Sequence, residues 1–279
     1  MAPADGQCSR YRPNDHPGRY HLQVFDFPTV APGDPIRISA SIFVAFRQCP
    51  DQARARLQGE WGPESRAAFS GVLAHRLFAR HLSGGPIDAR DFGRVCRSEI
   101  GGSNLNYKLG ALGLKPSELG RVIDEVGAMY DRFKRIPAEG FVGAEVSIMV
   151  EPAQGVTLVG SVDAVFMGDD GVRLIDWKTG ELGEVVDQLR FYALLWALEK
   201  NELPQAVEAV SVQTGERVSE MPDSGVVTRT AGQVAEMVGQ LRSAWNEGAG
   251  IERRGGPWCK YCALLDSCSE GRAATRLGV

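Results

Sequence analysis

The sequence lacks several features that would settle its class at once. No apolar run approaches the ~20 residues that a membrane-spanning helix needs, and the first residues hold no apolar stretch suited to a secretion signal. These absences argue against an integral membrane protein and predict a cytoplasmic location. The phosphate-cradling pattern G-x-x-x-x-G-K-S/T is also missing, so we expect no helicase motor within the chain, and any partner proteins are encoded elsewhere.

Charge of one sign is not in large excess either. The 31 lysines and arginines nearly balance the 35 aspartates and glutamates, which gives a formal net charge of −4. A broadly basic surface, which nucleic-acid-binding domains often carry, is therefore not expected. A metal-centred cleft needs only local positive charge, however, and one segment concentrates arginines that can line a cleft or form a solvated helix face. They are Arg54, Arg56, Arg66, Arg76 and Arg80.

What is present is an ordinary globular composition, with 43% hydrophobic and 24% charged residues in a chain of 279. This length can bury a sizeable core. Hydrophobic periodicity predicts an α/β fold in residues 36–279, after an N-terminal extension of residues 1–35, with a helical lobe at residues 87–137. Strands are expected at residues 20–27, 141–151, 156–167, 172–177, 207–212 and 226–230, with a polar hairpin or loop at residues 216–225. Helices are expected at residues 36–57 (in two pieces, capped by Ser39 or Ser41), 65–82, 115–135 and 231–246, and from about residue 184.

Residues 160–192 carry the side chains that point to chemistry. Gly-Asp-Asp-Gly at residues 168–171 is typical of a hairpin turn between two strands. Asp163 lies on the first strand, whereas Asp176 and Lys178 lie on the second and share a face because side chains alternate with period 2. Two carboxylates and an ammonium at the ends of paired strands suit hydrolysis of a phosphodiester. Carboxylates bind Mg²⁺ or Mn²⁺ well, and such a metal lowers the pKa of a bound water.

An Asp-x-Lys pair on a strand is a weak signal by itself, because such pairs are often solvated salt bridges. The order of the elements strengthens it here, since the next helix carries Gln188 and Tyr192 four residues apart on one face. This arrangement resembles the PD-(D/E)XK nuclease superfamily, and specifically its RecB-like branch. The matching motifs are Gly160-Ser-Val-Asp163, Asp176-Trp-Lys178-Thr-Gly180 and Gln188-Leu-Arg-Phe-Tyr192, with Val162 in place of the superfamily's proline.

The resemblance implies a restriction-endonuclease-like core, in which helices flank a mixed central sheet. It also implies that Asp163 and Asp176 hold Mg²⁺ or Mn²⁺. His75 becomes a further ligand because Gly71-Val-Leu-Ala-His75 resembles the family's first motif; without the resemblance, a satisfied core histidine is the better interpretation. Glu145 stands on the strand where many family members have an acidic residue, but its register is open, and a salt-bridged or solvated side chain is favoured.

The function that the resemblance implies is metal-dependent DNA cleavage, with an exonuclease that prefers single strands as the expected form. Lys178 would assist the attacking water, and Gln188 and Tyr192 would position the scissile phosphate or the lysine. DNA repair, recombination and CRISPR spacer acquisition are all compatible settings. Two alternatives stay open: a catalytically silent DNA-binding or assembly protein with the same fold, and a zinc-stapled interaction protein.

Three cysteines near the C-terminus follow the spacing C-x2-C-x5-C: Cys259, Cys262 and Cys268. In a cytoplasmic chain this clustering indicates metal ligation rather than disulfides, and Cys49 is the natural fourth thiolate of a tetrahedral site. The split arrangement resembles the 4Fe-4S staple of RecB-like exonucleases, a group that includes the AddB nuclease domain and CRISPR-associated exonucleases. It implies that residues 257–269 close onto Cys49 around an iron-sulfur cluster, with zinc as the alternative.

Overall fold

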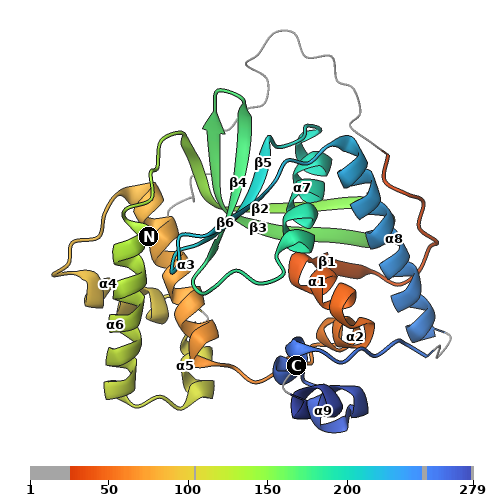
Figure 1. The fold of residues 1–279 in the computed structure, drawn as a ribbon, viewed down its shortest axis with the longest axis horizontal. Coiled ribbons are helices and arrows are strands. Elements are labelled where there is room, and N and C mark those ends of the chain that lie inside the picture. The colour runs from red at the N-terminus through yellow and green to blue at the C-terminus, as the bar shows by residue number, and fades with distance from the viewer. Residues whose placement is uncertain (1–25, 104, 247–249, 278–279) are drawn as a thin grey trace, which may run out of the picture.

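The computed structural model describes residues 26–103, 105–246 and 250–277, and it places a mixed sheet between two layers of helices (Figure 1). The strand predicted at residues 20–27 falls almost entirely outside the described residues. No helix in the described part of the chain combines the length and the hydropathy that a bilayer crossing requires.

The sheet contains six strands. They are β1 (Ile36–Ser39), β2 (Phe141–Ala153), β3 (Val156–Gly168), β4 (Gly171–Lys178), β5 (Ala206–Ser211) and β6 (Arg217–Glu220). The strand order is β1-β3-β4-β5-β6, with β2 paired to β3. Pairs β1/β3 and β4/β5 are parallel, and the other three pairs are antiparallel. The prediction of a mixed central sheet is therefore confirmed.

Strand β3 is the centre of this sheet. Strand β2 runs along one edge of β3, while β1 pairs with residues 156–159 and β4 with residues 164–168. Because β2 occupies one edge over this whole length, β1 and β4 must share the other edge in succession. Residues 160–163 lie between them and have no ladder partner there among the described residues. Backbone groups at such a gap need side chains or solvent as partners, which makes it a natural place for a polar site.

Two hydrophobic clusters hold helices on the two faces of the sheet. Helices α1 (Ala40–Gln48), α7 (Val186–Lys200) and α8 (Ser224–Asn246) cover one face. Helices α3 (Arg66–Gly84), α4 (Phe92–Gly101) and α6 (Pro116–Phe133) cover the other (Figure 1). Side chains along β4 alternate between the two faces of the sheet. Leu174 joins the first cluster, and Ile175 and Trp177 join the second.

The remaining elements are α2 (Pro50–Leu57), α5 (Leu105–Leu112), α9 (Ser269–Arg276) and two short 3₁₀ turns, Pro257–Tyr261 and Leu265–Ser267. Helices α4, α5 and α6 lie within residues 87–137, and the assignment of this stretch as a separate lobe stays a prediction. The C-terminal segment, drawn in blue, lies beside α2 (Figure 1). The division of the chain at residue 35 stays a prediction.

The strand predicted at residues 226–230 is wrong, because these residues form the start of α8. Adjacent β-branched residues favour a strand locally, but Val227, Ala231 and Val234 follow helical spacing and are fully buried against the sheet layer. The Asp223 carboxylate also accepts the backbone N–H of Val226 at 2.6 Å, which starts the helix. The preceding polar hairpin or loop, predicted at residues 216–225, contains edge strand β6.

The helix predicted to begin at residue 36 starts four residues later. Residues 36–39 form β1 instead, because parallel pairing with β3 buries Ile36 and Ile38. The predicted cap is confirmed: Ser39 Oγ accepts the N–H of Ile42 at 3.4 Å, and α1 follows directly. Cys49 then separates α1 from α2, as the prediction of two helical pieces requires.

Candidate active site

Asp163 stands at the gap between β1 and β4 on strand β3. Its Oδ2 accepts the backbone N–H of Trp177 at 2.7 Å, so the carboxylate satisfies a β4 group at the place where the ladder ends. Its Oδ1 lies 3.2 Å from His75 Nδ1 on α3. Because β1 and β4 part at this point, the Asp163 carboxylate accepts a hydrogen bond from the β4 backbone and also contacts His75 of α3 on one face of the sheet.

Asp176, Lys178, Gln188 and Tyr192 form one connected network between β4 and α7. Lys178 Nζ lies 2.8 Å from Asp176 Oδ2 and donates to Gln188 Oε1 at 2.8 Å. Gln188 Nε2 donates to Asp176 Oδ1 at 2.9 Å and to the Tyr192 hydroxyl at 3.3 Å. Both periodicity arguments hold, because the two β4 side chains share a face and the two α7 side chains meet each other.

Gly160 allows α7 to approach β3 closely enough for this network. A Cβ at Gly160 would stand 2.6 Å from Leu195 Cδ1 and 3.2 Å from Tyr192 Cε1. Any side chain here would therefore displace α7 or the tyrosine ring. The glycine in the Gly160-Ser-Val-Asp163 motif thus has a packing role, which is to seat the helix that orients Gln188.

Glu145 joins His75 and Asp163 in a compact group. One ligand atom from each of these three residues lies within 4.8 Å of the others. The β2/β3 register brings Glu145 opposite Asp163, and Glu145 has a left-handed backbone with φ of 50°. This conformation costs on the order of 1–3 kcal/mol in a non-glycine residue and is common at functional sites. The sequence favoured a salt-bridged or solvated Glu145; the side chain is exposed, and its carboxylate also accepts from Ser161 Oγ at 3.1 Å beside this group.

Three ionisable side chains of the site have raised pKa values, which indicates that the site is short of positive charge. Burial, together with the Asp163 charge and against the opposing Lys178, raises the pKa of Asp176 to about 6. Burial and Asp163 also raise the pKa of Glu145. For His75, burial lowers the pKa, but the charge and hydrogen bond of Asp163 outweigh it, so that its pKa lies above the ordinary value. Carboxylates that hold protons more tightly than usual are a favourable setting for a divalent cation.

Arg76 is a site residue that sequence reasoning did not single out. It lines an open pocket with Val72, His75, Glu145 and Asp163, and its charge lowers the pKa of Glu145. Its Nε is buried and has no hydrogen-bond partner among the described residues. The only signal was its place in the arginine-rich segment. Three arginines of that segment form surface or half-buried ion pairs instead: Arg54 with Asp51, Arg66 with Glu125 and Arg80 with Glu99.

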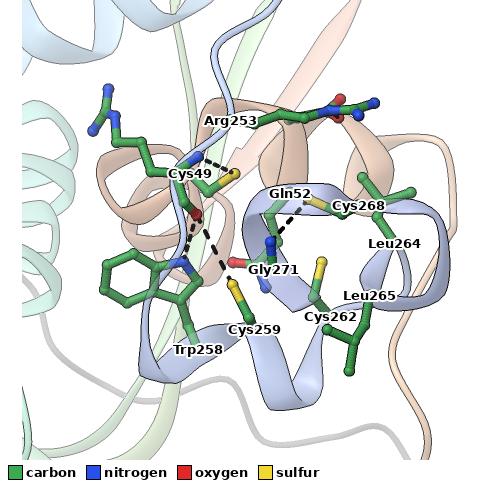
Figure 2. A pocket seen from close by; sticks show the side chains of 12 residues that line it. Cys49, Gln52, Arg253, Trp258, Cys259, Cys262, Leu264, Leu265, Cys268 and Gly271 are labelled. Atoms are coloured by element: carbon green, nitrogen blue, oxygen red, sulfur yellow. Dashed lines mark hydrogen bonds and ion pairs between the residues drawn. The ribbon is translucent and has the colours of Figure 1, made fainter. Parts of the chain in front are cut away.

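The four predicted thiols converge at a second place. Cys49, Cys259, Cys262 and Cys268 line one pocket between α2 and the C-terminal segment, and Figure 2 shows their sulfur atoms turned toward a shared space. Backbone N–H groups donate to three of the sulfurs: Arg254 to Cys49 at 3.4 Å, Gly256 to Cys259 at 3.4 Å and Gly271 to Cys268 at 3.3 Å. Such donors stabilise thiolates and tune bound clusters.

Two arginines, Arg253 and Arg254, also line this pocket, and each is paired with a carboxylate. Arg253 pairs with the buried Asp51 of α2 at 2.7 Å. Asp51 also pairs with Arg54, so its carboxylate is satisfied on both sides while it ties the C-terminal segment to α2.

A mixed sheet between two helical layers, with carboxylates and a lysine where strands part, defines the restriction-endonuclease-like fold class. A family model described as the PD-(D/E)XK nuclease superfamily matches residues 37–269, and the chain belongs to this superfamily.

One solved structure agrees with this chain at the level of fold. A protein from Eubacterium rectale, described as a putative exonuclease, superposes with a TM-score of 0.51 at 16% identity, over 85% of this chain and 88% of that one. The structure of SSO0001 gives a TM-score of 0.38 at 14% identity, over 86% of this chain and 88% of that one. None of the curated proteins compared with the sequence matches it.

Proposed function

We propose that this protein is a metal-dependent DNA nuclease that hydrolyses phosphodiester bonds. The observation that carries the proposal is the meeting of His75, Glu145 and Asp163 beside the Asp176 and Lys178 pair. Three carboxylates and an imidazole supply the oxygen and nitrogen ligands that Mg²⁺ or Mn²⁺ takes. When bound, the metal would polarise a phosphoryl oxygen and lower the pKa of a water.

The side chains of the site would have separate roles in this reaction. Asp163, His75 and Glu145 hold the metal, and Asp176 completes the set from the neighbouring strand. Lys178, as a compact cation, offsets the negative charge that builds on the phosphate in the transition state and orients the attacking water. Gln188 fixes the Lys178 ammonium by accepting from it, and Tyr192 fixes Gln188 in turn.

The finer assignment is a RecB-like exonuclease that prefers single-stranded DNA and works in the cytoplasm. The motif order along the chain and the exonuclease description of the Eubacterium rectale protein support it. DNA repair, recombination and CRISPR spacer acquisition are all settings for such an enzyme. The sequence contains no P-loop pattern, so any unwinding would come from outside these 279 residues.

The four-cysteine pocket supports a 4Fe-4S cluster, because its thiols face one space with N–H donors at three of the sulfurs. Cys49, Cys259, Cys262 and Cys268 would hold the cluster, which would tie α2 to the C-terminal segment. Cross-links across loops near 100 residues remove about 4 to 5 kcal/mol of unfolded-chain entropy in model estimates, so the role is structural. Iron and sulfide in protein purified without oxygen would support the cluster. If the analysis found zinc without iron or sulfide, a zinc site would replace the proposed cluster, and the nuclease proposal would stand.

The experiment that tests the activity uses end-labelled linear and circular single-stranded DNA with Mg²⁺ or Mn²⁺. Wild type is compared with Lys178→Ala and with Lys200→Ala, a control at the far end of α7. An exonuclease at this site is supported if wild type and Lys200→Ala digest linear DNA but not circular DNA, and Lys178→Ala digests neither. Cutting of both forms indicates an endonuclease. Binding without cleavage by metal-loaded wild type would favour a DNA-binding protein with the same fold.

A further inference from the structure

A second open groove lies beside the cysteine pocket and is not part of the catalytic pocket. We call it the Trp61 groove; it is lined by Arg56, Trp61, Glu64, Ala68, Lys108 and Tyr261, together with Gly62 and Pro63. Its walls come from α2, the loop before α3, the first turn of α3, helix α5 and the C-terminal segment. The Trp61 and Tyr261 side chains are 59% and 58% exposed, which is unusual for large aromatic residues at the same depression.

The two aromatic walls are fixed to one another through their backbones. A Cβ at Gly62 would overlap the carbonyl oxygen of Tyr261, so only glycine lets the Trp61 loop lie against the segment that carries Cys259 and Cys262. Arg56 Nη1 donates to Ser41 O at 3.0 Å and holds its guanidinium in place. Backbone contacts therefore fix the walls of the groove, and none of the residues that the structure describes occupies it.

Each exposed ring has a cation above it. The Arg56 guanidinium lies 5.8 Å from the centre of the Trp61 ring, and Lys260 Nζ lies 5.0 Å from the centre of the Tyr261 ring. Lys108 Nζ adds a third cation, paired with the Glu64 carboxylate at 2.6 Å. Local charge is thus positive in a chain whose net charge is −4. Aromatic faces with adjacent cations suit unpaired bases joined by phosphates.

The groove also leads to the catalytic pocket along one helix face. Ala68 lines the Trp61 groove, whereas Gly71, Val72 and His75 line the catalytic pocket. Steps of three and four residues put these positions on one face of α3. The seven-residue rise from Ala68 to His75 is about 10 Å, the length of about three stacked nucleotides.

From this arrangement we infer that the Trp61 groove binds unpaired bases of the nucleic-acid strand whose phosphodiester lies at His75. The inference rests on the proposed nuclease function and adds a substrate subsite to it. Trp61 and Tyr261 stack on successive bases through the ring faces that Arg56 and Lys260 leave free, and these two cations contact the phosphates between the bases. A duplex does not fit this role, because its base faces are already stacked on each other.

Binding is the direct test, with the Lys178→Ala protein as background so that the strand stays intact. Fluorescence anisotropy measures the affinity for labelled oligothymidylates of 3 and 16 nucleotides and for a blunt duplex. Trp61→Ala and Tyr261→Ala are each expected to weaken 16-nucleotide binding on the order of ten- to a hundredfold, as loss of base stacking does. The 3-nucleotide strand and the duplex should be unaffected. Trp61→Phe should restore most of the affinity.

Tyr107→Ala is the matched control, because Tyr107 is 84% exposed on the helix of Lys108 but does not line the groove. Thermal unfolding shows whether each variant is folded. Unchanged 16-nucleotide binding in both groove variants, or an equal loss in Tyr107→Ala, would overturn the subsite while wild-type cleavage of DNA keeps the nuclease proposal. If wild type bound the 16-nucleotide strand through the Trp61 groove but did not cleave DNA, the nuclease proposal would be wrong and the groove would remain a strand-binding site.

Discussion

Replacing Asp176 by asparagine is expected to stabilise the metal-free protein at neutral pH while it abolishes cleavage. Asp176 is 4% exposed, and its pKa is raised from 3.8 to about 6, mainly by burial and by Asp163. The ionised carboxylate is therefore disfavoured in the folded state by about 3 kcal/mol, at ~1.4 kcal/mol per pKa unit. Asparagine keeps an acceptor for Gln188 Nε2, whereas its amide nitrogen replaces Oδ2 beside Lys178 Nζ, which keeps Gln188 Oε1 as an acceptor; the net gain is therefore below this figure.

The sign of the effect follows from linkage. A carboxyl whose pKa is higher in the folded state contributes most below its unfolded pKa, and the contribution is lost as the pH rises through the folded pKa. Asp176→Asn and wild type should thus be similar near pH 4. Between pH 4 and pH 6 the free energy of unfolding of the variant should rise above that of wild type, and the difference should persist at higher pH.

Urea unfolding in EDTA at pH 4, 6 and 8 measures this difference. Asp170→Asn, at an exposed carboxylate in the turn between β3 and β4, serves as the control and should follow the wild-type curve. Added Mg²⁺ should stabilise wild type more than the variant, because the metal binds the ionised site. A variant that is less stable than wild type at pH 8, or a difference that does not change with pH, would refute the reasoning.

Three further outcomes are expected. Glu145→Gln should weaken Mn²⁺ binding at least tenfold in calorimetric titrations, whereas Glu151→Gln on the same strand should not, because only Glu145 reaches the group of ligands. Arg76→Ala should lower the slope of log affinity against log salt for single-stranded DNA by about 0.7, since one phosphate contact is lost; an unchanged slope would place Arg76 outside the substrate path. Gly160→Ala should cost about 1–3 kcal/mol in urea unfolding and slow cleavage, because its Cβ crowds Tyr192; full stability would contradict the packing argument.

The local parts of the site were readable from the sequence because short-range rules fix them. Turn residues at 168–171 force a hairpin, period 2 puts Asp176 beside Lys178, and a four-residue step puts Gln188 beside Tyr192. The structure contains each of these arrangements. Their roles in catalysis stay proposals.

The long-range parts were not readable in this way. The left-handed backbone of Glu145 and its register against β3 depend on pairing between strands, and no local pattern specifies them. The same limit explains the wrong strand at residues 226–230, where burial against the sheet outweighs β propensity. Arg76 could be assigned to the site only when α3 was placed beside Asp163 and Glu145.

The sequence by itself determined which residue types are available, the order of the motifs and the four-cysteine spacing. Tertiary structure decided which of these side chains share a site. It brought Cys49 to the C-terminal cysteines and Glu145 to His75 and Asp163, and it aligned the Trp61 groove with the catalytic pocket along α3. The physical reason is that contacts between distant segments depend on how both faces of the sheet are buried, a property of the whole chain and of no short stretch within it.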